Sequence, residues 1–357
     1  MQAAVYRSFG GPIRIEKVPI PSLPDEDAIL VQVKATGVCR SDWHGWKGHD
    51  GDVLAHGLPF VPGHEFSGIV VQKGSRISTL HVGDRVVAPF ILSCGSCRCC
   101  RRDRPTVCLQ QQQPGFTYWG SFAEYVVVPR ADRNVCRLPP RVSFVQAAAL
   151  GCRFTTAYRA VLQQGRLQAG ETVVIMGCGG VGLSCVMLAK GASRTVAVDV
   201  SKEALDMARS LGATDVVLAR GLSDEQVREK VIQLLDGDEG ADLSIDAAGF
   251  KSTCENAIHC TARGGRMVQV GLPLGHVAPE IPMAMVAGRE LELIGSHGFA
   301  SDALPDLLDR IAQGQLDPGR LVQREVSLRE GARILERMDH ESPLGITMIT
   351  QLTESKL

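Results

Sequence analysis

Residues 172–182 of this 357-residue chain read TVVIMGCGGVG, an apolar run followed at once by a glycine-rich turn. A helical pattern continues from the turn to Lys190. This context is typical of a dinucleotide site: the first glycine permits the tight turn, the second lets the backbone approach a pyrophosphate, and the third lets helix and strand pack closely. The phosphates then lie at the helix N-terminus. The predicted contacts are Gly177, Gly179, Gly180, Val181 and Gly182.

Asp199 ends the next apolar run, residues 195–198, at the distance expected of a ribose-binding acid. A carboxylate there accepts hydrogen bonds from the adenosine ribose hydroxyls and repels a 2′-phosphate. This predicts NAD as the coenzyme rather than NADP. The alternative for Asp199 is a helix N-cap before Ser201. Lys202 is a further candidate near the adenosine, with a solvated surface position as its alternative.

Two kinds of pattern divide the chain. In its first third, short β-type runs such as residues 28–33 and 125–128 alternate with Pro and Gly, which predicts a β-rich domain. Further on, apolar strands alternate with helical segments, which predicts βαβ units and a parallel sheet, an α/β domain. We expect a first domain over residues 1–153, a dinucleotide-binding domain over 154–295, and a C-terminal segment, 296–357, that returns to the first domain.

The composition, with 45% hydrophobic and 22% charged residues, predicts a soluble globular protein. A net charge of −1 provides no basic field for nucleic acid or an acidic membrane, and no apolar run reaches membrane-spanning length. Twelve cysteines without an apolar leader favour metal-bound thiolates in a reducing compartment. The last three residues, Ser355-Lys356-Leu357, predict peroxisomal import if the source is a eukaryote; otherwise we expect a cytoplasmic protein.

Residues 37–44, GVCRSDWH, contain a thiol, a guanidinium, a hydroxyl, a carboxylate and an imidazole within six consecutive positions. A thiolate at Cys39 suits Zn²⁺, Ser41 can hand a proton onward, and His44 titrates near neutral pH. The sequence Gly63-His64-Glu65 and Cys152 supply further candidate ligands. One histidine and two cysteines with one open position are the arrangement of a catalytic zinc site, where two thiolates balance the charge of the ion.

A second candidate metal site is a loop of four cysteines spaced C-x2-C-x2-C-x7-C over residues 94–108. Four thiolates so close in sequence can close a tetrahedron around one structural zinc, and an iron–sulfur cluster is the competing interpretation. Cys99, inside the loop, is not expected to be a fifth ligand. The predicted ligands are Cys94, Cys97, Cys100 and Cys108.

These motifs, in this order, resemble the zinc-dependent medium-chain alcohol dehydrogenases over essentially the whole chain. The resemblance implies a GroES-like β-rich catalytic domain, a Rossmann coenzyme domain, and an active site in the cleft between them. It implies Cys39, His64 and Cys152 as catalytic zinc ligands. Glu65 would be a transient or outer ligand, and Asp42 would hydrogen-bond to His64.

The same resemblance implies a mechanism. The alcohol loses its proton through Ser41, the nicotinamide ribose and His44 to solvent, and hydride passes to NAD⁺. Arg40 would reach the coenzyme pyrophosphate, and Val270 would offer backbone contacts beside the nicotinamide. Two zinc ions per subunit are expected.

The predicted substrate pocket consists of Phe90, Trp43 and Trp119, each with core packing as its alternative. If they line the site, the substrate is an apolar or aromatic primary alcohol or its aldehyde. A polyol or amino-alcohol dehydrogenase of the same superfamily is the nearest alternative, and glutathione-dependent formaldehyde oxidation stays open. From another class, a zinc-free nucleotide-binding protein would lack the metal ligands. The family forms homodimers and homotetramers through the sheet edge of the coenzyme domain.

Overall fold

A computed structural model describes residues 1–235, 240–273, 277–341 and 343–353. The chain divides into two compact units: Met1–Cys152 together with the chain from Gly298 onward, and Arg153–His297. No helix among the described residues combines the length and apolar character needed to cross a bilayer. The tripeptide Ser355-Lys356-Leu357 lies outside the described residues.

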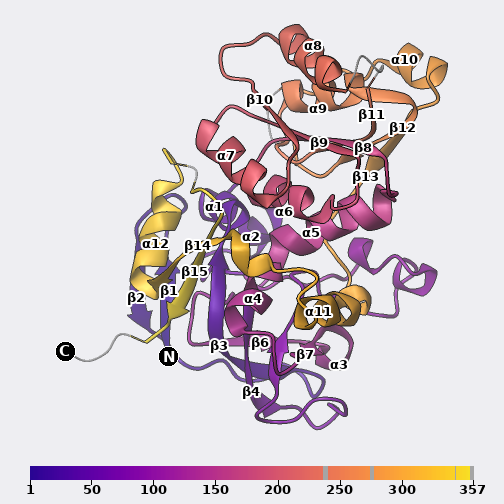
Figure 1. Cartoon of the computed structure of the whole chain (residues 1–357). Coiled ribbons are helices and arrows are strands. Elements are labelled where there is room, and N and C mark those ends of the chain that lie inside the picture. The colour runs from indigo at the N-terminus through magenta and orange to yellow at the C-terminus, as the bar shows by residue number, and fades with distance from the viewer. Residues whose placement is uncertain (236–239, 274–276, 342, 354–357) are drawn as a thin grey trace. The chain divides into compact units, whose positions relative to one another are not determined.

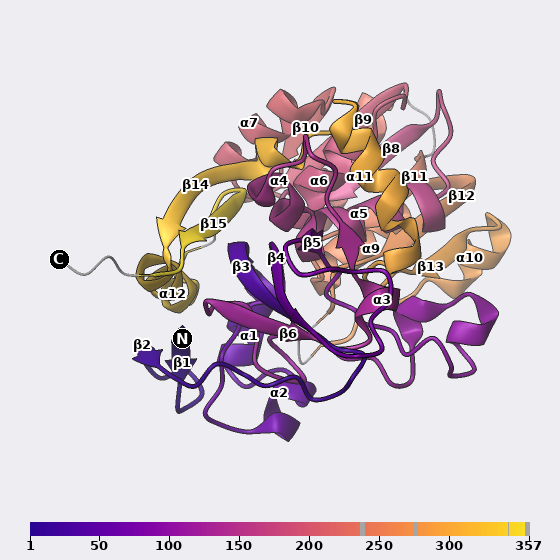
Figure 2. The same cartoon turned by 90° about the horizontal axis from the view of Figure 1, so that it is seen from below.

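A seven-stranded sheet forms the base of the first unit, in the order β14-β15-β3-β4-β5-β7, with β6 paired to β3 beside this path (Figure 2). The central strand β3, Ile29–Val38, pairs antiparallel with β4, β6 and β15. Its valine, isoleucine and threonine side chains suit a pleated, buried surface. The other strands are β4 (Phe66–Lys73), β5 (Arg85–Val87), β6 (Tyr125–Val128), β7 (Cys136–Arg137), β14 (Val322–Ser327) and β15 (Ile346–Gln351).

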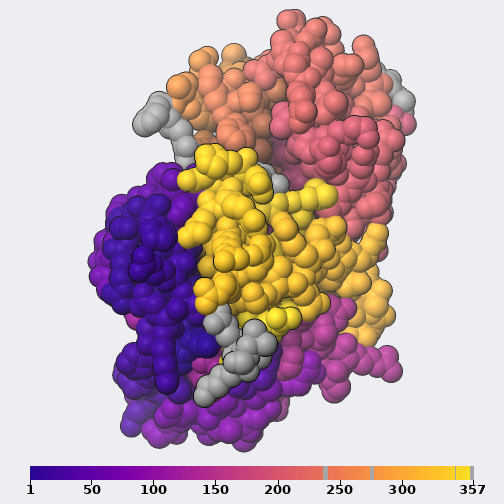
Figure 3. All heavy atoms as spheres, turned by 90° about the vertical axis from the view of Figure 1, so that its left-hand side faces the viewer, coloured from indigo at the N-terminus to yellow at the C-terminus, as the bar shows by residue number. Residues whose placement is uncertain are grey.

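The end of the chain packs on its beginning within this unit. Figure 3 shows the yellow C-terminal segment against the indigo N-terminal one. The helix α12, Leu328–Arg337, joins the core cluster that contains the buried side chains of strand β1, Gln2–Tyr6, which pairs with β2, Ile13–Lys17. Its buried residues recur at helical spacing, and Ser327 caps its N-terminus.

The first unit also contains short helices that connect its strands. The α-helices are α1 (Arg40–Trp46), α2 (Gly51–His56), α3 (Ala131–Asn134), α4 (Phe144–Ala149) and α11 (Leu304–Ala312). The 3-10 turns are Cys100–Arg102, Pro105–Val107, Ser301–Ala303 and Pro318–Leu321.

A six-stranded sheet in the order β10-β9-β8-β11-β12-β13 organises the second unit, and every pair in it is parallel. Figure 1 shows α8 and α9 on one side of this sheet and α6 and α7 on the other. Strands covered on both faces are expected to be continuously apolar, as TVVIM is. The predicted parallel α/β fold is confirmed. The strands are β8 (Thr172–Met176), β9 (Arg194–Asp199), β10 (Asp215–Leu218), β11 (Ala241–Asp246), β12 (Thr261–Gln269) and β13 (Glu292–Gly295).

Helices fill the connections between these parallel strands. They are α6 (Gly180–Leu188), α7 (Lys202–Leu211), α8 (Asp224–Leu234), α9 (Lys251–His259) and α10 (Met283–Gly288). A further helical stretch enters the unit from α4 through a π-turn (Leu150–Phe154), α5 (Thr155–Tyr158) and a second π-turn (Arg159–Gln164).

Candidate active site

Asp42 ties the start of α1 to the segment before β4. Its buried carboxylate accepts hydrogen bonds from the backbone N–H groups of Cys39 (3.0 Å) and Gly63 (2.9 Å), and its Oδ1 lies 2.8 Å from His64 Nδ1. Because a carboxylate oxygen accepts, His64 donates through Nδ1, and in the neutral ring the lone pair then lies on Nε2, which is the form that binds a metal. Asp42 thereby fixes both the tautomer and the orientation of this ring.

The ligand atoms of Cys39, His64, Glu65 and Cys152 all lie within 4.8 Å of one another. Three of the four residues are buried, and Cys152 is half-buried. Cys39 follows β3 directly, while His64 and Glu65 precede β4, which pairs with β3. Cys152 comes from the π-turn after α4. Residues far apart in sequence thus form one group, which we call the buried metal group.

Donor chemistry shows what this group can hold. His64 Nε2 is buried and has no hydrogen-bond partner among the described residues. A buried nitrogen lone pair without a donor is costly, and so are thiols and carboxylates crowded together without a cation. A divalent ion that accepts imidazole and thiolate ligands removes both costs, and Zn²⁺ prefers this donor set. The residues therefore fit zinc.

A kink in the backbone brings Cys152 to the group. The helical stretch from α4 is interrupted at Gly151, whose φ is 19° and ψ is −128°. A Cβ atom at Gly151 would lie 2.5 Å from Cβ of Glu65, so only glycine fits. The Cys152 N–H then donates to Glu65 Oε1 at 3.0 Å. No periodicity in the sequence indicated this kink.

Two phenylalanines flank the histidine of the buried metal group. The ring centroids of Phe90 and Phe116 lie 6.0 and 5.0 Å from that of His64. Phe90 was a predicted pocket residue, but sequence reasoning missed Phe116, which lies in a turn without a periodic pattern. Trp119 instead donates its indole N–H to the carbonyl of Pro59 and lines a different cavity of about 670 Å³.

Trp43, the third predicted pocket residue, contacts the end of α12. Its indole N–H donates to Asp339 Oδ1 at 2.7 Å. The guanidinium of Arg40 lies 4.3 Å from the centre of the Trp43 ring and donates to the carbonyl of Met338. Arg40 and Trp43 therefore form one stacked pair held by the chain after α12.

The two predicted proton carriers, Ser41 and His44, both lie on α1 and are half-buried. His44 Nδ1 lies 3.3 Å from His49 Nδ1. Burial, together with the charges of His49 and Arg40, lowers the pKa of His44 to about 4. His44 is consequently neutral at physiological pH and can accept a proton.

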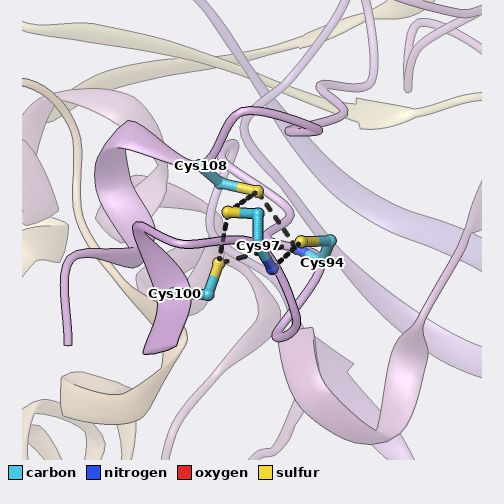
Figure 4. Close-up of side chains that lie close together, drawn as sticks. All are labelled: Cys94, Cys97, Cys100 and Cys108. Carbon is cyan, nitrogen blue, oxygen red and sulfur yellow. Dashed lines mark hydrogen bonds between the residues drawn. The ribbon is translucent and has the colours of Figure 1, made fainter. Parts of the chain in front are cut away.

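The four-cysteine loop forms a compact sulfur cluster (Figure 4). Sγ of Cys97 lies 3.5 Å from that of Cys100 and 3.8 Å from that of Cys108, and Cys94 and Cys100 are separated by 3.9 Å. Tetrahedral thiolates around one zinc at ~2.3 Å are roughly 3.8 Å apart. Thiolates around an iron–sulfur cluster would be further apart, because the cluster lies between them. The spacing therefore favours a single metal ion.

Backbone N–H groups also point at these sulfurs. Cys94 Sγ accepts from the N–H groups of Ser96 and Cys97, and Cys108 Sγ accepts from those of Cys94 and Gln110. Such donors stabilise thiolate over thiol, which is the form that binds a metal. Cys99 is not a member of this group of four.

In the second unit, the glycine turn has the conformation that its sequence predicts. Gly177 adopts a φ of +92°, which favours glycine, and a Cβ at Gly182 would lie only 1.7 Å from the carbonyl oxygen of Gly177. A Cβ at Gly179 would meet no atom within 4 Å. Packing within the protein therefore explains why position 182 must be glycine, but it does not explain why position 179 is glycine. The open space beside Gly179, at the N-terminus of α6, fits the approach of a pyrophosphate.

Asp199 lies against this turn at the end of β9. Its carboxylate accepts hydrogen bonds from the N–H groups of Cys178 (2.6 Å) and Ser201 (2.7 Å). The N-cap of α7 is Ser201, so the alternative interpretation of Asp199 as the cap is wrong. Lys202 is exposed and pairs with Asp206 at 2.8 Å. Val270, directly after β12, donates its N–H to the backbone carbonyl of Asp246 at the end of β11.

Comparisons with known proteins agree with this geometry. Residues 25–140 match the family model of the alcohol dehydrogenase GroES-like domain, and residues 180–313 match that of the zinc-binding dehydrogenases. The chain is 33% identical over 341 residues to an alcohol dehydrogenase of Geobacillus stearothermophilus, covering 95% of this chain and 96% of that one. It is 31% identical to the sorbitol dehydrogenase of Bacillus subtilis, covering 94% and 93%.

Among solved structures, one described as a zinc-binding dehydrogenase of Sinorhizobium meliloti 1021 bound to NADP is similar, with a TM-score of 0.87 and 28% identity. The likeness covers 98% of both chains.

Proposed function

Since the chain belongs to the zinc-dependent medium-chain alcohol dehydrogenases, and is thus an oxidoreductase of alcohols or polyols, we propose that it interconverts a primary apolar or aromatic alcohol and its aldehyde with NAD. One observation carries the proposal. The sulfurs of Cys39 and Cys152 and a ring nitrogen of His64 lie within 4.8 Å of one another, and the buried His64 Nε2 has no hydrogen-bond partner among the described residues.

The proposed catalytic ligands are Cys39, His64 and Cys152. Zinc held there acts as a Lewis acid that stabilises the negative charge developing on the oxygen of the alcohol. Asp42 holds the His64 ring through Nδ1, which would leave Nε2 available to a metal ion, and Glu65 accepts a hydrogen bond from the backbone N–H of Cys152 and so positions it. Cys39, Asp42, His64 and Glu65 are buried, which keeps water from them and strengthens the electrostatic contacts between them, while Cys152 is half-buried.

The proposed proton acceptor is His44, reached through the hydroxyl of Ser41. A group with a pKa of about 4 is unprotonated at neutral pH, so the imidazole is in the form that can take a proton. The imidazole then passes the proton to water, because a group with a low pKa binds a proton weakly. The half-burial of both side chains on the same short helix supports this route.

NAD is the proposed coenzyme because Asp199 places negative charge beside the glycine turn. Its carboxylate is oriented by two backbone N–H groups, and further lone pairs stay available for ribose hydroxyls. The negative charge of Asp199 would repel the 2′-phosphate of NADP. Because a similar structure is bound to NADP, the preference of this protein for NAD over NADP is measured with both coenzymes in the experiment below.

The substrate class rests on Phe90 and Phe116. Two aromatic rings close to a proposed metal ligand provide apolar contact area, which suits a hydrophobic or aromatic alcohol better than a polyol. A polyol is the second candidate, favoured by the likeness to a sorbitol dehydrogenase. Cys152 argues against it, since polyol and amino-alcohol relatives often carry a carboxylate at that position.

Two further parts of the proposal concern the second metal ion and the assembly. The sulfur cluster of the four-cysteine loop would hold a structural zinc, giving two ions per subunit.

The edge strand β13 ends the six-stranded sheet, and α10 beside it buries none of its residues. We expect a homodimer through this edge, or a homotetramer built from such dimers.

A substrate screen tests the proposed function. Purified protein is supplied with NAD or NADP and with primary, secondary, aromatic and polyol substrates, while the absorbance of the reduced nicotinamide is followed. We expect the highest kcat/KM for an apolar or aromatic primary alcohol with NAD. Predominant turnover of polyols would overturn the substrate class, and turnover with NADP alone would overturn the coenzyme.

A further inference from the structure

Two histidines outside both cysteine-containing groups face each other. His44 lies near the end of α1 and is half-buried, and His49 lies in the exposed turn before α2. Their Nδ1 atoms are 3.3 Å apart and their ring centroids 5.6 Å apart. Neither residue belongs to the two groups of metal-binding side chains described above.

The 3.3 Å distance can be compared with that of a hydrogen bond and with that of two ligands of a shared ion. N–H···O hydrogen bonds in proteins usually span about 2.7–3.2 Å, most often about 2.9–3.0 Å, and the contact between the two ring nitrogens, at 3.3 Å, is slightly longer. Two imidazole nitrogens bound at ~2.0–2.1 Å to one tetrahedral ion are roughly 3.3 Å apart. The separation of the two Nδ1 atoms therefore matches neighbouring ligands of a metal more closely than a direct hydrogen bond.

Surrounding contacts hold the two rings in place. The Trp43 ring meets both imidazoles edge-on, with centroids 4.8 Å from His44 and 5.5 Å from His49. Trp43 is itself fixed by its hydrogen bond to Asp339. Rings that are already oriented lose little freedom when they bind an ion, which favours binding. The lowered pKa of His44 also leaves its lone pair free at neutral pH.

The charges around the pair are mixed. Asp50 follows His49 directly, and its Oδ1 is held by the N–H groups of Asp52 and Val53. Lys47 is paired with Asp339 at 2.9 Å, which offsets its charge. Arg40, stacked on Trp43, is the opposing cation. A carboxylate beside the pair therefore balances this cation, so electrostatics does not prevent weak binding.

We propose that His44 and His49 form a weak, exchangeable site for a first-row divalent ion, with water completing the coordination. Imidazole ligands suit Cu²⁺, Ni²⁺ and Zn²⁺, with Cu²⁺ the tightest. An ion on both Nδ1 atoms requires the Nε2–H form of each ring. His44 then has no nitrogen free to accept a proton, so, given the proposed function, the ion inhibits alcohol oxidation.

Titration with Ni²⁺ tests the site. Calorimetry in a non-chelating buffer is carried out on the full chain with its resident metal ions and with Cys99→Ser, which removes a competing thiol. One further Ni²⁺ should bind per chain. His44→Gln and His49→Gln should each weaken that binding at least tenfold, whereas His56→Gln, on the neighbouring helix α2, should not change it. Unchanged resident zinc content checks that each variant is folded.

Two results would overturn the site: no Ni²⁺ binding beyond the resident ions up to millimolar concentration, or equal affinity in His49→Gln. Activity separates the inhibition from the binding. Ni²⁺ should inhibit the parent protein over the same concentration range and should inhibit His49→Gln at least tenfold less. Binding without inhibition would retain the site and overturn its effect on His44. An inactive protein that still binds Ni²⁺ through His49 would refute the proposed function alone.

Discussion

At the scale of single residues, the buried metal group depends on Asp42. This carboxylate joins the start of α1, the backbone before β4 and the His64 ring, so one side chain sets the relative positions of two proposed ligands. Its role is to position groups, because it orients His64 rather than contacting the ion itself. Effects of changing it should therefore appear first in metal retention.

Replacing Asp42 with Asn tests this role. The amide oxygen can still accept hydrogen bonds, but the negative charge that stabilises His64 is lost. We expect zinc affinity to fall by about 10–100-fold, as measured by competition with a chelator. Asp84→Asn, at a partly exposed carboxylate in the turn before β5, is the matched control and should retain the metal. Equal affinity in both variants would show that Asp42 does not support the ion.

Asp199→Asn tests coenzyme choice at the same scale. The amide keeps an oxygen for the N–H groups of Cys178 and Ser201 but lacks the charge that repels a 2′-phosphate. We expect the ratio of kcat/KM for NAD over NADP to fall about tenfold, equivalent to about 1.4 kcal/mol. Asp206→Asn, whose partner Lys202 is exposed, should leave the ratio unchanged. A ratio that stays constant in Asp199→Asn would mean that another feature selects the coenzyme.

His44→Gln tests the proton route through its pH dependence. Because burial lowers the pKa of His44 to about 4, the parent imidazole can accept a proton throughout the range from pH 6 to 9. In the variant the proton must pass directly to water or hydroxide. We expect kcat/KM for alcohol oxidation to fall about tenfold or more at pH 6 and to approach the parent value as pH rises. A loss of the same size at every pH would argue against His44 as the acceptor.

At the scale of elements, the turn between β8 and α6 separates glycines needed for packing from glycines needed for a ligand. Gly182 approaches the backbone of Gly177 too closely for any side chain, whereas the space beside Gly179 is open. The same motif thus contains two different physical requirements. A pair of alanine substitutions can distinguish them.

Gly182→Ala should destabilise the protein by about 1–3 kcal/mol, because the added methyl group forces α6 away from β8. Gly179→Ala should leave the unfolding midpoint in denaturant unchanged while raising the Kd for the coenzyme at least tenfold. Gly288→Ala, at the end of α10 with no atom near its Cβ, is the control for both measurements. If Gly179→Ala binds the coenzyme normally, the pyrophosphate does not lie beside Gly179.

At the scale of the whole molecule, the edge of the parallel sheet at β13 is the surface that we propose for assembly. Within the part of the chain that the structure describes, the strand β13 pairs with β12 alone, and Met283 on α10 and Leu293 on β13 are 63% and 39% exposed. Open sheet edges with exposed apolar residues invite pairing with a second chain.

Leu293→Lys tests the assembly. A charge on the edge strand should disfavour pairing between two copies, so light scattering after size-exclusion chromatography should show a shift toward monomer. Leu54→Lys, at an exposed leucine of α2 in the first unit, is the control and should keep the parent mass. A monomeric parent protein would remove the proposed dimer, and an unchanged mass in Leu293→Lys would move the interface elsewhere.

Local order along the chain was sufficient to predict several parts of this protein. The glycine turn, the parallel sheet and the four-cysteine loop each depend on residues close in sequence, where spacing restricts geometry directly. The loop could be predicted as a sulfur cluster because C-x2-C-x2-C-x7-C leaves its thiols little room to separate. The grouping of Cys39, His64 and Cys152 was proposed from their donor chemistry and supported by family resemblance, since spacing alone cannot bring such distant residues together.

Tertiary structure decided the remaining features. The kink at Gly151, the position of Phe116 beside His64, the outward cavity lined by Trp119 and the facing rings of His44 and His49 all arise from contacts between separate segments. Such contacts depend on how strands pair and how helices pack, which sequence patterns do not encode residue by residue. Sequence by itself thus determined which chemical groups are present and the elements that carry them, whereas folding decided which of those groups meet.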